Sequence, residues 1–254
     1  MFHRPAKILA LCSMLCLLAS CATFSDEDEK AAQLHLQLGV SQLNQGNFPQ
    51  ALKELLIAEK MDSKNPQIQN SLGLAYYVRQ RYDLAEKHVL KAVTLKNDFT
   101  DARNNLANIY LEQGKYDLAL EESNKVVADL TYIYPEKGQI NLGLIYFKKG
   151  QFALAKTKFQ KAMDLQKDNC LASSYYGRTL YELKDLKKAS EALDQAVGFC
   201  QRSQFDEPHY YSALTYYQMG RVEKAEVRLE ELIKLYPRGK YVDKAKDMLE
   251  TIKK

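Results

Sequence analysis

Tryptophan is absent from this chain of 254 residues, and glycine and proline are scarce, with 11 and 6 residues. So little glycine and proline excludes a collagen-like protein and favours helices. Five cysteines are too few for a disulfide-dense miniprotein, and the sequence lacks the repeated long apolar runs of a polytopic membrane protein. A hydrophobic fraction of 46% with a formal net charge of only +4 argues against disorder. The composition therefore predicts a folded, largely helical body.

The first twenty residues have the pattern of a cleaved export signal. Arg4 and Lys7 form a basic start, and the apolar run 8–18 follows. That run is shorter than the roughly 20 residues needed to span a bilayer. It ends in Leu-Ala-Ser-Cys at 18–21, which resembles the lipobox of bacterial lipoproteins, where the cysteine is acylated and becomes the first residue. We expect removal of residues 1–20 and lipidation of Cys21; an ordinary signal peptide is the alternative.

Removal of this leader leaves the charge almost balanced, with 34 basic and 32 acidic side chains. Such a balance argues against nucleic acid as a partner, because phosphate binding needs a concentrated basic surface. By resemblance to Gram-negative lipoproteins, Ala22 rather than Asp after Cys21 implies sorting to the outer membrane. Several acyl chains on one cysteine would anchor the protein durably in that membrane. The segment 21–31 is expected to be the lipidated cysteine and a short, solvated acidic tether.

The rest of the chain repeats with a period of 34 residues. A small residue recurs in every repeat, at Gly39, Gly73, Ala107, Gly143, Gly177 and Ala213. An alanine follows twelve residues later each time, at Ala51, Ala85, Ala119, Ala155, Ala189 and Ala225. This pattern resembles the tetratricopeptide repeat, with repeats that begin near 32, 66, 100, 136, 170 and 206.

The resemblance implies an all-α fold, in which each repeat is a pair of antiparallel helices and the pairs stack into a right-handed superhelix with a concave face. Small residues at the helix crossing let the two backbones approach closely. Two of the intervals are 36 residues instead of 34, and the first of these contains Pro135, which closes one helix before the next begins. Six repeats are expected over 32–237, followed by an amphipathic capping helix over 238–254.

Two cysteines besides Cys21 remain once the leader is removed. Cys170 is the first position of repeat five and Cys200 is position 31 of the same repeat. An antiparallel helix pair brings these two ends side by side, so a disulfide is geometrically allowed and would stabilise the fold by roughly 3–4 kcal/mol. We predict this bond, because an exported protein folds in an oxidising compartment; two buried free thiols are the alternative.

No catalytic, cofactor or metal motif is present in the sequence. His35, His88 and His209 each lie alone in a different repeat, and no glycine-rich phosphate-binding loop occurs. Two thiols with scattered histidines do not make a zinc site. We therefore predict no enzymatic activity, no cofactor, no metal and no small-molecule substrate. An enzyme with an unrecognised site is the alternative.

The concave face is the candidate site for a protein partner. By the tetratricopeptide resemblance, positions 2, 5, 9, 12 and 13 of each repeat point into the groove. Asparagine amides can pair with the backbone of an extended ligand, and Tyr, Leu and Phe offer apolar pockets. For any single residue, packing against a neighbouring helix is the alternative. The candidate groove residues are Asn70, Leu74, Tyr77, Asn104, Asn108, Leu111, Ile140, Leu144, Phe147, Arg178, Tyr181, Tyr210, Leu214 and Tyr217.

The combination of lipobox, short tether and six repeats resembles the type IV pilus biogenesis lipoproteins of the PilF, PilW and Tgl family. Two segments strengthen the likeness, "DLTYIYPEKG" before repeat four and "LIKLYPRGKY" at the end of repeat six. Members of this family act as pilotins, which help the outer-membrane secretin to localise and to assemble into its multimeric pore. The resemblance implies a protein anchored in the outer membrane through acyl chains on Cys21, facing the periplasm, whose partner is the type IV pilus secretin. An adaptor for another envelope machine, in outer-membrane protein assembly or with peptidoglycan enzymes, is the alternative.

Overall fold

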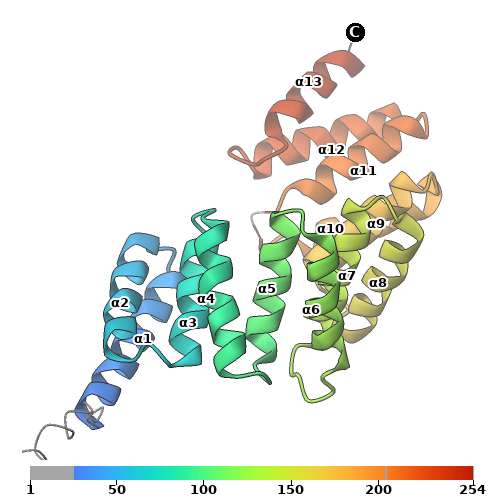
Figure 1. The fold of residues 1–254 in the computed structure, drawn as a ribbon. Helices are drawn as coiled ribbons and strands as arrows, with labels where there is room; N and C mark the ends of the chain where they lie inside the picture. The colour runs from blue at the N-terminus through green and yellow to red at the C-terminus, as the bar shows by residue number, and fades with distance from the viewer. Residues whose placement is uncertain (1–25, 204, 254) are drawn as a thin grey trace, which may run out of the picture.

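The computed structural model of the protein describes residues 26–203 and 205–253 (Figure 1). The predicted leader and Cys21 lie outside the described residues. Within these ranges the chain is helical throughout, with short connections and no strand. The helices are α1 (Asp26–Asn44), α2 (Phe48–Met61), α3 (Pro66–Tyr77), α4 (Tyr82–Leu95), α5 (Thr100–Glu112), α6 (Tyr116–Ala128), α7 (Pro135–Lys148), α8 (Phe152–Leu165), α9 (Cys170–Glu182), α10 (Leu186–Phe199), α11 (Glu207–Gln218), α12 (Val222–Leu235) and α13 (Val242–Ile252).

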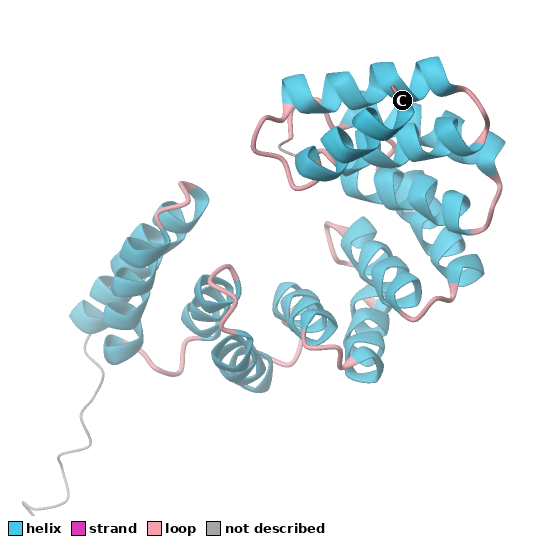
Figure 2. Ribbon diagram, turned by 90° about the horizontal axis from the view of Figure 1, so that it is seen from above, coloured by secondary structure: helices cyan, strands magenta, loops and turns pink. Residues whose placement is uncertain are grey.

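Helices α1 to α12 form six antiparallel pairs that stack in chain order into a curved array (Figure 2). Each odd-numbered helix also contacts the next odd-numbered helix, from α1 to α11. Among the described helices, no contact of comparable extent links one even-numbered helix to the next. The odd-numbered helices therefore line the inner, concave side, and the even-numbered helices lie outside. The all-α superhelical fold predicted from the 34-residue period is confirmed.

Close crossings within the helix pairs explain the recurring small residues. A Cβ atom added at Gly73 of α3 would collide with the side chain of Val89 in α4, and one added at Gly143 of α7 would lie 2.5 Å from the ring of Phe159 in α8. Val89 and Phe159 are both fully buried. Because interiors are densely packed, a larger residue at either glycine would force these side chains or the helices apart.

The turns inside the repeats share one backbone conformation. Gly46, Gly114 and two further glycines in the same repeat position take positive φ values between 69° and 76°. Repeats two and five have no glycine there, yet Gln80 and Lys184 adopt φ values of 58° and 63°. The helix crossing therefore dictates the left-handed turn, even where the residue type does not favour it.

The start of the array differs from the sequence expectation. α1 begins at Asp26, so the acidic residues expected in a solvated tether form the first turns of a helix instead. Acidic side chains are favourable in the N-terminal turns of helices. The helix continues into Ala32 and Leu36, which are buried in a cluster with residues of α2 and α3. No helix among the described residues is long and apolar enough to cross a membrane.

The C-terminal end is closed by α13, which packs on the last helix pair through Tyr241, Val242 and Ala245. Its exposed face carries charged residues, so it covers the apolar end of the array with a polar surface. The turn before it is held by Asp206, whose buried carboxylate accepts a hydrogen bond of 2.7 Å from the backbone N–H of Tyr241.

A disulfide bond closes repeat five. Cys170, the first residue of α9, is bonded to Cys200, the residue that follows α10, across a sequence separation of 30 residues. The two thiols are therefore not free in this structure. The bond lies beside the longer connection that leads from repeat five to repeat six.

A candidate partner-binding groove

The concave side holds an open cleft of about 490 Å³ at the N-terminal end of the array. α1 and α3 form its walls, because they are neighbouring inner helices. Its apolar lining is Leu36 and the partly exposed Val40, and the remainder is polar. The lining residues are Gln33, Leu36, Gln37, Val40, Ser41, Asn44, Gln67 and Ser71.

Asparagines connect the inner helices of repeats two to four. The Asn105 side chain donates a hydrogen bond of 2.9 Å to Asn70 Oδ1, and the Asn141 side chain donates one of 2.9 Å to Asn104 Oδ1. Asn70 and Asn104 are both buried. These two candidate groove residues therefore use their amides between helices, where an unpaired polar group would be costly.

In repeats four to six, an arginine of the inner helix α9 lies among aromatic rings. The Arg178 guanidinium lies 4.7 Å from the ring centroid of Phe147 and 4.5 Å from that of Tyr211. Its Nη1 forms an ion pair of 2.7 Å with Oε1 of Glu207, whose side chain is only 3% exposed. A guanidinium that is paired and stacked in this way is a structural element of the groove wall.

Five of the fourteen candidate residues are buried and serve packing between inner helices: Asn70, Asn104, Leu111, Ile140 and Phe147. The others retain accessible surface, and Tyr217 is the most open of them, with 45% exposed. Arg178 is partly exposed but is used in the stack and ion pair described above. The candidate contact surface therefore narrows to Leu74, Tyr77, Asn108, Leu144, Tyr181, Tyr210, Leu214 and Tyr217.

Tyrosines give this surface an uncharged character. Tyrosine is neutral at physiological pH, and burial raises the pKa of Tyr77 further, to about 12. Tyr77 also packs against Tyr82, with a centroid distance of 5.7 Å. Neutral aromatic and aliphatic side chains beside amides suit a protein segment as ligand better than a charged small molecule.

Models of the tetratricopeptide repeat match the chain at residues 36–98, 100–123, 137–169 and 209–239. This chain is a tetratricopeptide-repeat protein. No curated protein sequence matches it.

Solved structures with the same tetratricopeptide superhelix include two pilus proteins. The chain from the functional characterisation of Pseudomonas aeruginosa PilF is 20% identical, with a TM-score of 0.72, over 88% of this chain and 100% of that one. PilW, described as a widely conserved type IV pilus biogenesis factor, is 20% identical, with a TM-score of 0.76, over 84% of this chain and 97% of that one. A chain of the APC/C complex Cut9–Hcn1 has a TM-score of 0.78 at 20% identity, over 89% of this chain but 44% of that one. At this identity the likeness shows the fold.

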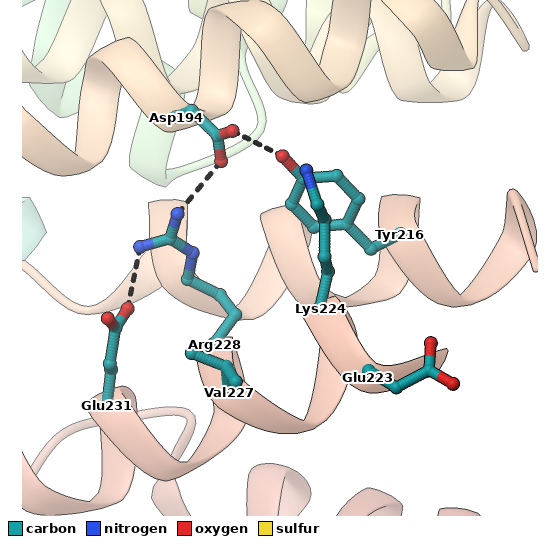
Figure 3. Close-up of a pocket in the computed structure, with 7 residues that line it drawn as sticks. All are labelled: Asp194, Tyr216, Glu223, Lys224, Val227, Arg228 and Glu231. Atoms are coloured by element: carbon teal, nitrogen blue, oxygen red, sulfur yellow. Dashed lines mark hydrogen bonds and ion pairs between the residues drawn. The ribbon is translucent and has the colours of Figure 1, made fainter. Parts of the chain in front are cut away.

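A second cleft of this tetratricopeptide-repeat protein lies on the outer side, between α10 and α12, with a volume of about 390 Å³ (Figure 3). Asp194 at its centre accepts hydrogen bonds from the hydroxyl of Tyr216 and from Nη2 of Arg228, the latter at 3.0 Å. Arg228 Nη1 is also paired with Glu231 at 2.7 Å. These ion pairs and hydrogen bonds join repeats five and six, so Asp194 and Arg228 are used within the fold.

The three histidines of the repeats have structural surroundings. His35 Nδ1 lies 2.8 Å from Glu54 Oε2, and His88 stacks on Tyr76 with a centroid distance of 5.3 Å. His209 is buried, and burial together with the positive charge of Arg228 lowers its pKa to about 4. Among the described residues, no group of three His, Cys, Asp or Glu side chains could hold a metal ion.

The sequence analysis missed the cleft between α1 and α3. Its lining includes Gln33, Leu36, Val40 and Asn44, which are positions 2, 5, 9 and 13 of a repeat that begins at 32. The position rule that selected the other groove residues would therefore have found these four as well. None of the four is among the groove residues predicted from the sequence, which begin at Asn70 in repeat two.

Proposed function

We propose that this protein is an outer-membrane-anchored tetratricopeptide scaffold that acts as a pilotin, promoting localisation and multimerisation of the type IV pilus secretin. One observation carries the proposal: the fold is similar to those of PilF and PilW over 100% and 97% of their lengths, so the similarity extends over all or nearly all of each chain. The Cut9 match covers less than half of its chain and lends no comparable support to a role like that of Cut9. The lipobox pattern at 18–21 supports the anchor.

The cleft between α1 and α3 is the best candidate for the secretin contact. It is open, it contains the partly exposed Val40, and its α3 wall, at Gln67 and Ser71, belongs to the same inner helix as the partly exposed Leu74 and Tyr77. Farther along, Arg178, Phe147 and Tyr211 are engaged in contacts with one another. An extended or helical secretin segment with an apolar anchor residue fits the early repeats better than the later ones.

The mechanism is physical. Acyl chains on Cys21 hold the array at the inner face of the outer membrane, and the groove captures secretin subunits there. Capture on a surface raises the local concentration of subunits, so that multimerisation proceeds faster without any chemical step.

A pair of matched variants tests the site. Val40→Arg places a charge in the cleft, and Leu90→Arg places the same charge on the outer helix α4, where the leucine is 45% exposed. We expect Val40→Arg to reduce heat-resistant secretin multimers on an immunoblot, because a charge cannot be buried against an apolar anchor, and Leu90→Arg to leave them unchanged. Normal multimers with abundant, folded Val40→Arg protein would reject this site.

A further inference from the structure

The connection between α6 and α7, residues 129–134, exposes two large aliphatic side chains; we call it the apolar loop. Leu130 is 96% exposed and Ile133 is 76% exposed, more than any other large hydrophobic residue in the described part of the chain. Exposure of this extent at two neighbouring positions is a common mark of an interaction surface.

Hydrogen bonds of Asp129 and Tyr132 to α5 keep Leu130 and Ile133 pointing outward. Asp129 accepts hydrogen bonds from the hydroxyls of Thr100 and Thr131. Tyr132 is buried, and its hydroxyl donates a hydrogen bond of 2.7 Å to Asp101 at the start of α5. Because Asp129 and Tyr132 are fixed to α5, Leu130 and Ile133 cannot turn inward without breaking these bonds. The loop presents them in a preorganised conformation.

An aromatic ring and a basic side chain lie next to the two aliphatic tips. Tyr134 is partly exposed, and Lys137 Nζ lies 3.9 Å from its ring centroid. The Tyr134 ring meets that of Tyr132 edge to face, at a centroid distance of 5.9 Å. Aliphatic tips flanked by tyrosine and lysine are the arrangement that side chains adopt at a membrane–water interface.

The apolar loop lies on the edge of the array where the chain enters it. It joins the end of an outer helix to the start of an inner helix, and α1 likewise starts at this edge; both project downward in Figure 1. Cys21 precedes the first residue of α1 by five positions. Leu95 and Leu165, which end α4 and α8 on either side of the loop, are also exposed at this edge, at 41% and 53%.

We infer that the apolar loop inserts its tip into the lipid surface that carries the acyl anchor, so that the array is attached at two points. The inference rests on the proposed lipid anchor. Acyl chains on Cys21 and aliphatic side chains at the α6–α7 connection would attach the same edge of the array to the membrane. The helix axes would then point away from the membrane surface, and the groove would lie parallel to it. An acyl anchor alone would not fix the direction in which the groove faces.

The absence of tryptophan makes the test direct, because a single introduced tryptophan is the only indole in the protein. Leu130→Trp places this reporter at the tip of the apolar loop. Lys148→Trp is the matched control, since Lys148 is exposed at the opposite end of α7. Each full-length variant is matured in bacteria, purified and added to phosphatidylethanolamine–phosphatidylglycerol vesicles with or without brominated acyl chains. Flotation with the vesicles reports the anchor, and bromine quenching reports contact with lipid chains.

We expect both variants to float, with quenching and a blue shift of emission for Leu130→Trp and neither for Lys148→Trp. Flotation without quenching of Leu130→Trp would overturn the loop contact and would leave the anchor and the pilotin proposal intact. Equal quenching of both variants would also overturn it, because the array would then have no fixed orientation. Failure to float would overturn the anchor and the loop contact together.

Discussion

Arg178 in α9 and Glu207 in α11 form an ion pair of 2.7 Å across two successive repeats, with the Glu207 side chain only 3% exposed. The guanidinium is stacked against Phe147 from the preceding repeat and Tyr211 from the following one. One side chain therefore connects the inner helices of three repeats. Here the polar and aromatic side chains are engaged with one another, whereas the cleft at α1 and α3 is open, which makes that cleft the better partner site.

Substitution of Arg178 should measure how much this side chain contributes to the stability of repeats five and six. Arg178→Met leaves the Glu207 carboxylate buried without a counter-charge, and we expect a loss of about 3–5 kcal/mol in the free energy of unfolding. The double variant Arg178→Met with Glu207→Gln removes the charge as well and should recover much of that loss. Urea unfolding followed by circular dichroism measures both. If single and double variants are equally unstable, the charge pair is not the cause.

The helix crossing of repeat two gives a second prediction. Gly73→Ala forces a methyl group against the stiff, β-branched Val89, and we expect a loss of about 1–3 kcal/mol in the free energy of unfolding. Gly198 in α10 is the matched control, since a Cβ there meets nothing within 4 Å. Gly198→Ala should be neutral or stabilise by about 0.5–1 kcal/mol, through better helix propensity. Thermal unfolding of the two variants and the wild type measures these changes in stability. Equal changes in stability for Gly73→Ala and Gly198→Ala would contradict the close helix crossing at Gly73.

Acid should destabilise the last repeat through His209. Burial and the charge of Arg228 lower its pKa to about 4 in the folded protein, from 6.5 in an unperturbed histidine. The unfolded chain therefore takes up a proton below about pH 6.5 and the folded one does not, so stability present above this pH is lost as the pH falls towards 4. We expect a contribution on the order of 3 kcal/mol at most.

His209→Phe keeps the bulk beside Tyr236 and removes the titrating group. Its urea midpoint should fall less than that of the wild type between about pH 7 and about pH 4.5. Other groups titrate in both proteins, so the difference between the two isolates His209. Parallel pH profiles would show that this side chain does not titrate as described.

The disulfide of repeat five gives a fourth prediction. Replacing Cys170 and Cys200 by serine opens a loop of 30 residues, and the chain-entropy relation predicts a loss of about 3–4 kcal/mol in the free energy of unfolding. Reduction of the wild type should lower its denaturant midpoint to near that of the double-serine protein and leave the double-serine protein unchanged. An identical midpoint for oxidised wild type and double-serine protein would contradict a stabilising bond.

The sequence predicted those features of the fold that recur in each repeat. Gly73 and Gly143 were assigned to helix crossings because the same position is small in all six repeats, and the structure shows the side chains they accommodate. Gln80 and Lys184 could not be recognised as left-handed turn residues from their type. Their conformation follows from the crossing, which is a property of the pair of helices.

Features made by contacts between repeats were not predictable from the period. The period does not specify how neighbouring inner helices pack. It therefore could not show that the Asn104 side chain is hydrogen-bonded to Asn141 instead of being available to a binding partner. The outward turn of Leu130 likewise depends on the bond from Tyr132 to Asp101, 31 residues earlier. The cleft at Val40 could have been found, because it follows the same position rule as the rest of the groove.

The most direct test of the proposed function is an immunoblot of heat-resistant secretin multimers in outer membranes from a strain that lacks this protein. The account predicts that multimers are lost while secretin monomer remains, that the wild-type gene restores them, and that Cys21→Ala restores them poorly because the scaffold is no longer held at the membrane. Unchanged multimers in the deletion strain would contradict the pilotin role and would direct attention to another machine of the envelope.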